Sequence, residues 1–338
     1  MKLCGKLLRS GKGSMRWGEL LGKKKDDFTW LSERLNILTE NDTFDLINSG
    51  DKSLISTFKV GAWTMLKEMA LAYYAPNYAL ILRKQFHIRR LNYLDLFAGS
   101  GIVSLDGLSK YYLGSPLVVT KTIRQKLDKY YFFEKDALKT KQLGRLLAGE
   151  PCLIKQGDCN DLIDSVLPEI NVPGSHSLVF IDPFAMEINF DTIKKFATVG
   201  CDLIITVSTQ EIFRAIRQWF DNPTWNSNQV DSFFGDQEWR DSLAGIQTDE
   251  DIFNYYANRV VKFAFKKKPE STKIEKQLGG QHYFMLFTST GGRGERPKFF
   301  DIIDDFNRRI KNLSGEQITK YLQHYVEGGG TSLRGFFE

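Results

Sequence analysis

The sequence that decides the fold is YLDLFAGSG at residues 93–101. It begins in a short apolar run, which is typical of a buried β-strand, and leads directly into small residues. Gly99 and Gly101 allow positive φ and a close approach between backbone and ligand. Asp95 ends the strand, where its carboxylate can reach a ligand's ammonium group directly or through water. The segment therefore predicts a ligand-binding turn formed by Asp95, Phe97, Ala98, Gly99, Ser100 and Gly101.

The glycine pattern of this turn indicates which kind of nucleotide it can bind. The G-x-G-x-x-G fingerprint of dinucleotide-binding folds needs a third glycine three residues after Gly101, where this chain has Ser104. The turn therefore favours a nucleoside that carries an amino acid over a pyrophosphate. A turn that serves only chain reversal is the alternative, and the order of Asp, aromatic, Ala and two Gly argues against it.

Outward from this turn, short apolar runs alternate with helical stretches, which predicts a parallel sheet with crossover helices. We expect its strands at residues 91–96, 129–134, 152–156, 178–181 and 203–207. Residues 272–278 and 282–289 flank a Gly279-Gly280 turn and predict an antiparallel hairpin. The expected fold is α/β and Rossmann-like, with a mostly parallel sheet that ends in this hairpin.

The regions around the sheet are expected to be largely helical. Residues 1–27 form a flexible basic lead-in, and residues 28–90 predict an N-terminal helical cap with Pro76 as a break. The sheet domain is expected at 91–310, with a helical insertion at about 209–268. A capping-box pattern at Ser314 and Gln317 opens a helix in the last region, 311–338.

Two further strand ends carry candidate cofactor ligands. Glu134 ends the second predicted strand, where an acidic side chain can accept both hydroxyls of a ribose. Asp158 and Cys159 follow the third strand, where a polar side chain can bond the exocyclic amine of adenine. An Asx turn or helix N-cap is an equally good interpretation of Asp158.

The fourth predicted strand ends in Asp182-Pro183-Phe184, at the sheet edge where open α/β folds hold their substrates. A carboxylate that accepts one N–H, helped by the Pro183 carbonyl, would orient an amine nucleophile. Phe184 could stack on a flat base. We therefore expect Asp182, Pro183 and Phe184 to form the catalytic site, with Asp182 as an orienting group; a simple Asp-Pro turn is the alternative.

The net charge of +5 is concentrated at the start of the chain. Residues 1–25 hold eight Lys or Arg and one Glu (+8 −1 = +7), which leaves −2 for the remainder. Such an arm can bind phosphates through counterion release, although a solvated tail is the more common meaning. Two other features leave nucleic-acid contact and a plain structural role open: a basic set (residues 266–268, Arg293, Arg296, Lys298) and an aromatic set (Trp219, Trp225, Phe233, Phe234, Trp239).

Cysteine and hydropathy patterns exclude several classes of protein. The four Cys form no C-x-x-C pair and the four His lie far apart, so no metal site is predicted. No run of about eighteen apolar residues predicts a membrane span. Scattered thiols fit a reducing compartment, so the cytoplasm is expected. An organelle transit peptide is the alternative meaning of the Arg-containing, acid-poor start.

With these motifs in order, the chain resembles the three-Cys-motif partner family (TcmP) of S-adenosylmethionine-dependent methyltransferases. The resemblance runs from about residue 61 to 306. It is carried by YLDLFAGSG, GSPL at 114–117, FFEKD at 132–136, GDCN at 157–160, FIDPF at 180–184 and FFGDQEW at 233–239. The resemblance implies the class I methyltransferase fold, S-adenosylmethionine as cofactor, and a protein partner that is similar to radical S-adenosylmethionine enzymes and bears three cysteines.

The DPF segment also looks like the D-P-P-Y of amino-methylating nucleic-acid enzymes and the D-P-F-G of a guanine-modifying transfer-RNA family. Phe184 replaces the second proline of the first motif, and Ala185 replaces the glycine of the second. The expected function is methyl transfer from S-adenosylmethionine to an amine, with a base of RNA or DNA as the expected acceptor. The alternative is a silent module that senses the cofactor or acts as a scaffold for a partner.

Overall fold

The computed structural model of the chain describes residues 27–39, 59–61, 63–84, 88–108, 111–123, 127–265, 269–276, 282–291, 300–311 and 313–323. Several predictions lie outside these residues: the lead-in at 1–26, the lysine run at 266–268, the glycine turn at 279–280, Arg293, Arg296, Lys298 and the tail beyond 323.

The centre of the described fold is a seven-stranded sheet with the strand order β6-β5-β2-β7-β8-β10-β9. Its parallel strands are β2 (Arg90–Asp95), β5 (Lys129–Glu134), β6 (Cys152–Gln156), β7 (Ser175–Ile181) and β8 (Cys201–Val207). β9 (Glu270–Glu275) and β10 (His282–Ser289) form the hairpin, and β10 pairs antiparallel with β8. The predicted mostly parallel sheet of the class I methyltransferase fold, closed by an antiparallel hairpin, is confirmed.

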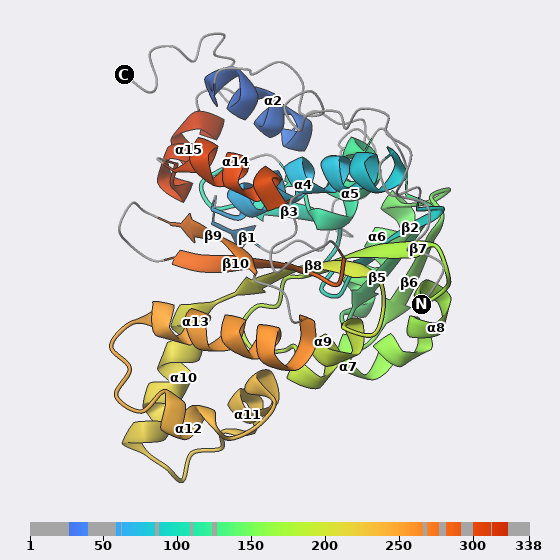
Figure 1. The fold of residues 1–338 in the computed structure, drawn as a ribbon. Helices are drawn as coiled ribbons and strands as arrows, with labels where there is room; N and C mark the ends of the chain where they lie inside the picture. The colour runs from blue at the N-terminus through green and yellow to red at the C-terminus, as the bar shows by residue number, and fades with distance from the viewer. Residues whose placement is uncertain are drawn as a thin grey trace, which may run out of the picture.

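Strand residues alternate between two apolar cores, one on each face of the sheet. Tyr93, for example, belongs to one core and Leu94 to the other. The first core is covered by helices that are drawn above the sheet in Figure 1: α4 (Thr64–Lys84), α5 (Ser115–Thr122), α14 (Asp301–Ile310) and α15 (Gly315–Leu322), with α2 (Asp27–Thr39) outside them. The second is covered by α7 (Cys159–Leu162), α8 (Leu167–Ile170), α9 (Phe190–Phe196) and the insertion.

The N-terminal region contains both predicted helix and unpredicted strand. Pro76 lies inside α4 and does not break it. Asn77 Nδ2 donates a hydrogen bond to the Tyr73 carbonyl at 2.8 Å, and nearly every apolar residue of α4 is buried, so packing outweighs the cost of the proline. β1 (Lys59–Val60) pairs with β3 (Ile102–Leu105), which pairs with β4 (Tyr111–Leu113). The glycine turn therefore continues into a small sheet, and a helix, α5, begins only at Ser115.

The insertion is helical, as predicted. It comprises α10 (Thr209–Asp221), α11 (Asn228–Phe234), α12 (Trp239–Ser242) and α13 (Asp249–Val260), followed by a π-helical turn at Val261–Phe265. Phe233, Phe234 and Trp239 are fully buried, and Trp219 and Trp225 pack against the same core. Base stacking by these aromatics, one of the two alternatives, is therefore contradicted for the three buried rings, because no face is open to a ligand.

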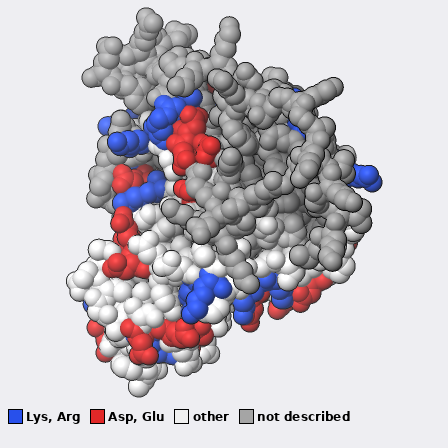
Figure 2. Space-filling view, viewed as in Figure 1, with Lys and Arg blue, Asp and Glu red and all other residues white. Residues whose placement is uncertain are grey.

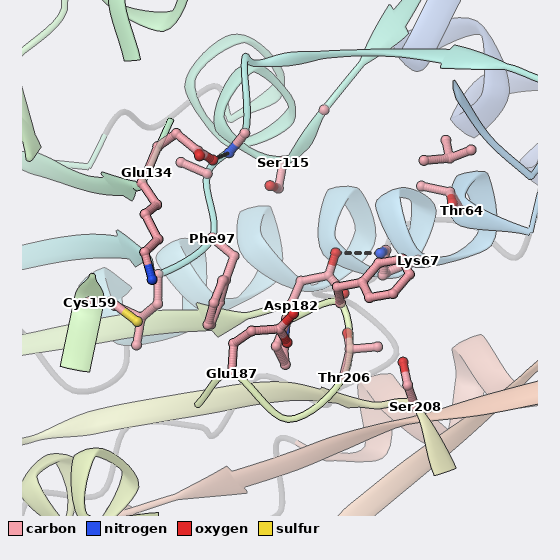
Figure 3. Close-up of a pocket in the computed structure, with 18 of the residues that line it drawn as sticks. Thr64, Lys67, Phe97, Ser115, Glu134, Cys159, Asp182, Glu187, Thr206 and Ser208 are labelled. Atoms are coloured by element: carbon pink, nitrogen blue, oxygen red, sulfur yellow. Dashed lines mark hydrogen bonds and ion pairs between the residues drawn. The ribbon is translucent and has the colours of Figure 1, made fainter. Parts of the chain in front are cut away.

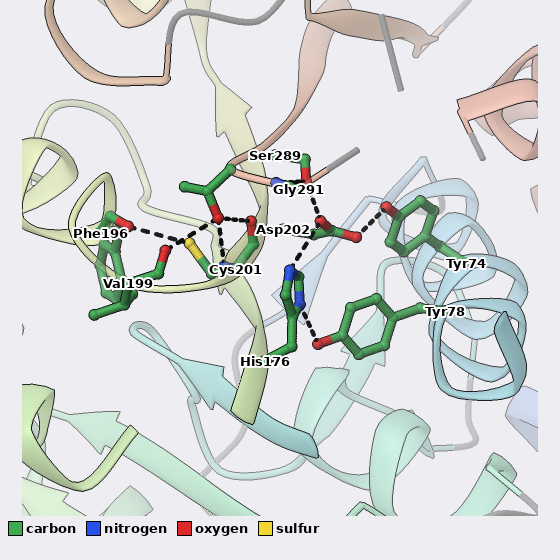
Figure 4. Close-up of polar contacts among 10 residues, drawn as sticks. Tyr74, Tyr78, His176, Phe196, Val199, Cys201, Asp202, Ser289 and Gly291 are labelled. Atoms are coloured by element: carbon green, nitrogen blue, oxygen red, sulfur yellow. Dashed lines mark hydrogen bonds and ion pairs between the residues drawn. The ribbon is translucent and has the colours of Figure 1, made fainter. Parts of the chain in front are cut away.

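A buried polar cluster joins α4 to the amino ends of β7 and β8, at the sheet edge opposite the glycine turn (Figure 4). Tyr74 Oη donates to Asp202 Oδ2 at 2.8 Å, and Ser289 Oγ donates to Asp202 Oδ1 at 2.5 Å. Tyr78 Oη lies 3.0 Å from His176 Nδ1. Burial raises the pKa of Asp202 to about 7 and lowers that of His176 to about 4.

Candidate active site

The predicted site residues converge on one cavity at the carboxyl ends of β2, β5, β6 and β7. Its volume is about 1290 Å³, above the 300 to 1,000 Å³ that is common for a small-molecule site, so a cofactor and a second molecule can share it. Every predicted site residue except Asp95 lines it: Phe97, Ala98, Gly99, Ser100, Gly101, Glu134, Asp158, Cys159, Asp182, Pro183 and Phe184. Residues as far apart in the chain as Phe97 and Phe184 meet here because parallel strands bring their carboxyl ends to one edge.

The glycine turn has the shape of a cradle. Gly99 has φ +61°, and a Cβ built there would meet nothing within 4 Å, so open space lies against its backbone. Gly101 has φ +86° and is closely packed against the GSPL segment: Gly114 N donates to Gly101 O at 2.9 Å, and a Cβ on Gly114 would lie 3.2 Å from that carbonyl. The turn is also held to β5, since Ala98 N donates to Phe133 O at 2.9 Å.

Glu134 fixes the cradle while it faces the cavity (Figure 3). Its Oε2 accepts a hydrogen bond from Gly99 N at 2.9 Å, and its Oε1 accepts one from Asp136 N at 2.8 Å. Each carboxylate oxygen has a second lone pair, so acceptance from ribose hydroxyls stays chemically open. Glu134 as the ribose ligand stays a prediction.

Asp158 fills one of the two roles that its sequence left open, that of a helix N-cap, and it also lines the cavity. It is the N-cap of α7, where its Oδ1 accepts from Asn160 N at 2.9 Å, and its Oδ2 lies 3.2 Å from Lys135 Nζ. It also lines the cavity, as does Cys159, which is 4% exposed and whose pKa is raised by burial to about 12. The cap is observed, and the adenine contact stays a prediction.

Asp95 differs from its expected placement. Its side chain has no exposed surface, and it accepts hydrogen bonds from Phe97 N at 3.2 Å and Tyr93 Oη at 3.1 Å, and also from the Ser115 hydroxyl. Burial raises its pKa to about 7. In this structure the carboxyl group of Asp95 is not part of the cavity lining, whereas Ser115 is. The predicted contact with a ligand's ammonium group, direct or through water, stays a prediction.

Asp182 lines the cavity at the end of β7 and is held by a neighbouring helix. An ion pair joins it to Lys67, which reaches across from α4, 115 positions earlier in the chain (Figure 3). Phe184, two residues on, is 83% exposed at the cavity, which is unusual for a large apolar side chain. Asp182, Pro183 and Phe184 thus lie together beside open space, as predicted.

Sequence reasoning missed the contribution of α4. Thr64, Lys67 and Glu68 line the cavity from one face of this helix, and Tyr283 lines it from β10. A signal existed: Lys67 and Glu68 are the only charged residues between positions 60 and 82. Two ionic residues inside a buried apolar helix indicate a site, because burying charge is costly unless something uses it.

Among the described residues, no group of three or more His, Cys, Asp or Glu side chains is arranged to hold a metal ion. None of the described helices is long and apolar enough to span a bilayer.

Comparisons with known proteins find solved structures of low similarity. No family model and no curated protein sequence matches the chain. Among solved structures, a Legionella pneumophila protein of the DUF519 family is 15% identical, with a TM-score of 0.42 over 70% of this chain and 92% of that one. The O-methyltransferase TomG from Streptomyces achromogenes, solved with SAM, is 12% identical (TM-score 0.36; 79% of this chain, all of that one). The plantazolicin methyltransferase BamL, solved with SAH, is 9% identical (TM-score 0.37; 79% and 100%).

Proposed function

We propose that this protein is an S-adenosylmethionine-dependent methyltransferase that transfers a methyl group to an amine. The observation that carries the proposal is the meeting, in one cavity, of the Gly99 cradle, the Glu134 strand end and the Asp182-Pro183-Phe184 segment. The resemblance to the TcmP family agrees with it. We include in the proposal a base of RNA or DNA as the acceptor and a three-cysteine protein as a partner, both of which rest on resemblance.

The residues present fit the cofactor. The open space against Gly99 admits the amino-acid half, and the carboxylate of Glu134 is available to ribose hydroxyls. When bound, S-adenosylmethionine supplies an electrophilic methyl group on a positively charged sulfur. Ser115, which donates to the buried Asp95, carries a hydroxyl oxygen into the cavity wall. That oxygen is free to accept a hydrogen bond from an ammonium group, so Asp95 would act through Ser115.

Asp182 and Phe184 suit an amine on a flat group. The carboxylate of Asp182 accepts an N–H and turns the nitrogen lone pair toward the methyl carbon, so most of the rate gain comes from orientation. The exposed ring of Phe184 offers a face for stacking, which is typical of base-binding sites. The Lys67 ammonium already engages Asp182, so the acceptor must share or displace this ion pair.

The test is transfer of labelled methyl groups from S-adenosylmethionine to RNA, DNA and protein extracts. Asp182→Asn keeps the shape and removes the charge that orients the amine, so we expect incorporation to fall by about 10² fold. Asp191→Asn is the matched control: this carboxylate is largely exposed, pairs with Lys194 and lies outside the cavity lining. Both variants should bind S-adenosylhomocysteine as the wild type does. Incorporation that is unchanged in Asp182→Asn would contradict the proposal.

The ion pair between Lys67 and Asp182 favours the second candidate, a silent module that binds the cofactor and acts through a partner. In that case Lys67 permanently occupies the carboxylate that an acceptor would need. The same experiment separates the two candidates. Cofactor binding without incorporation into any fraction, in the wild type and with partner protein added, would establish the silent module.

A further inference from the structure

Glu68 is a buried carboxyl group that the proposed function leaves without a role. It lies one helical turn after Thr64 on the face of α4 that lines the cavity, and its residue is only 3% exposed. Its Oε2 has no hydrogen-bond partner. Buried polar atoms of this kind are rare in folded proteins, because they lose hydration without compensation. An unpartnered oxygen beside a cavity indicates that a bound ligand supplies the missing hydrogen bond or an opposite charge.

The groups around Glu68 come from every neighbouring element. Lys67 is the cation on α4 itself, and Asp182 faces Glu68 from the end of β7. Asp95 and Tyr93 face it from β2, and Tyr283 faces it from β10. The ammonium group of Lys67 is already engaged with Asp182. Glu68 thus shares a low-dielectric pocket with two other carboxyl groups and one ammonium group.

This environment sets the charge of Glu68 before any ligand enters. Burial is the largest cause and raises the pKa of Glu68 well above its usual range; Lys67 lowers it, while Asp182 and Asp95 raise it further. The raised pKa means that the empty site favours the protonated form of Glu68. A positive charge that enters the cavity would reverse this preference, since an opposite charge stabilises the carboxylate.

We propose that Glu68 is the proton acceptor of this site: it releases its proton to solvent when the sulfonium cation of S-adenosylmethionine binds, and it regains one when the methyl group leaves. This inference rests on the proposed function and adds a residue to it. S-adenosylhomocysteine carries no charge on sulfur, so the same cavity holds Glu68 neutral when the product is bound.

Atoms and charges are conserved in methyl transfer with Glu68 as the proton acceptor. The acceptor nitrogen forms its bond to the methyl carbon as the carbon–sulfur bond breaks, and the sulfur keeps the electron pair. The nitrogen then carries one proton too many, and this proton passes to the Glu68 carboxylate, directly or through water. The products are a methylated neutral amine, neutral S-adenosylhomocysteine and protonated Glu68. Loss of the sulfonium charge makes Glu68 basic at the moment when a base is needed.

Isothermal titration calorimetry with the full chain tests this without an acceptor. S-adenosylmethionine and S-adenosylhomocysteine are each titrated at pH 7 in two buffers with different ionisation enthalpies, which gives the protons released by each. Both ligands carry the same amino and carboxyl groups, so the difference isolates the sulfonium. We expect the wild type to release up to one proton more with S-adenosylmethionine than with S-adenosylhomocysteine.

Two variants sharpen the measurement. Glu68→Gln keeps the shape of a neutral carboxyl group and should abolish the difference in proton release. Glu211→Gln is the matched control, because Glu211 lines the same cavity but is paired with Arg214 near the surface; it should keep the difference. A difference lost in Asp95→Asn and retained in Glu68→Gln would overturn the assignment to Glu68.

The wild type alone provides a second measurement, should Glu68→Gln fail to fold. A ligand that releases one more proton gains up to tenfold in relative affinity per pH unit. The ratio of the two dissociation constants should therefore move in favour of S-adenosylmethionine as pH rises from 6 to 8. Equal proton release and a flat ratio, with both ligands bound, would overturn the role of Glu68 alone. Binding of neither ligand would overturn the proposed function as well.

Discussion

At the scale of single residues, the cofactor cradle depends on backbone that lies open beside Gly99. Gly99 and Gly149 share a left-handed backbone, with φ +61° and +88°, and a Cβ on either would meet no protein atom within 4 Å. They differ in place: Gly99 lines the cavity, and Gly149 does not. A side chain at either costs similar backbone strain, on the order of 1 kcal/mol. Only at Gly99 would it fill space that a ligand needs.

We therefore expect Gly99→Ala to weaken binding of S-adenosylhomocysteine by about 10 to 100 fold, roughly 1.4 to 2.7 kcal/mol. Gly149→Ala should leave the affinity unchanged. Both should lower the midpoint of thermal unfolding to a similar extent. Titration calorimetry and thermal melts of the two variants check this. An equal effect of the two variants on affinity would show that strain, and not occupied space, accounts for any loss.

The residues of the site were only partly predictable. The motif residues lie where parallel strands end, and strand ends can be located from a sequence, so Glu134 and Asp182 were found. The burial of Asp95 was not predictable, because it depends on two hydrogen bonds that the sequence does not reveal. Tyr93 donates one from two positions earlier on the same strand, and Ser115 donates the other from the start of a separate helix. Lys67 was not predicted as a site residue because its partner, Asp182, is 115 positions away in the chain.

At the scale of elements, the polar cluster that ties α4 to β8 should give stability a distinct pH dependence. In the folded protein the pKa of Asp202 is raised from its ordinary value of 3.8 to about 7 by burial. Between these values the folded state keeps a proton that the unfolded chain loses, so stability falls as pH rises through this window. The pKa of His176 is lowered from 6.5 to about 4, so its contribution is lost as pH falls through that range.

Asp202→Asn removes the pH dependence that is due to Asp202 and retains the one that is due to His176. We expect the free energy of unfolding of the wild type, relative to the variant, to decrease between about pH 4 and 7, by up to about 4 kcal/mol. Urea unfolding across this range measures the difference, in which the contributions of His176 and Asp95 cancel. A difference that stays constant with pH would contradict the buried, protonated state of Asp202.

The bounds of strands with regular apolar patterns were predicted closely, whereas strands of two to four residues were not predicted. β5, β6 and β10 begin and end at the predicted residues. The starts of β7 and β8 were placed too late, because their first residues are polar: His176 and Asp202 are buried there only through the cluster around them. The strands β1, β3 and β4 have two to four residues each, too few to show a period, so pairing with one another is what makes them strands.

At the scale of the whole molecule, charge is distributed unevenly. Residues 209–260 of the insertion hold nine acidic and four basic side chains, 4 − 9 = −5. Figure 2 shows Asp and Glu gathered over the lower lobe, where α10 to α13 lie. A phosphate backbone would be repelled from this lobe, so a nucleic-acid acceptor would have to approach the cavity from another side.

The large-scale architecture was the most predictable level, since the order of apolar runs fixes the sheet. The joining of α4 to the sheet edge that lines the cavity was the least predictable, because it depends on packing between segments far apart in sequence. That junction is central to the proposed function, because it brings Lys67 and Glu68 into the same cavity as Asp182.

The central claim is that one cavity holds both S-adenosylmethionine and the amine that it methylates. A crystal structure with S-adenosylhomocysteine tests it most directly. We predict that the amino-acid half of the ligand lies against Gly99, the ribose lies at Glu134, and the sulfur points toward Asp182. Ligand density elsewhere on the protein, or in this cavity with the sulfur turned away from Asp182, would contradict the account.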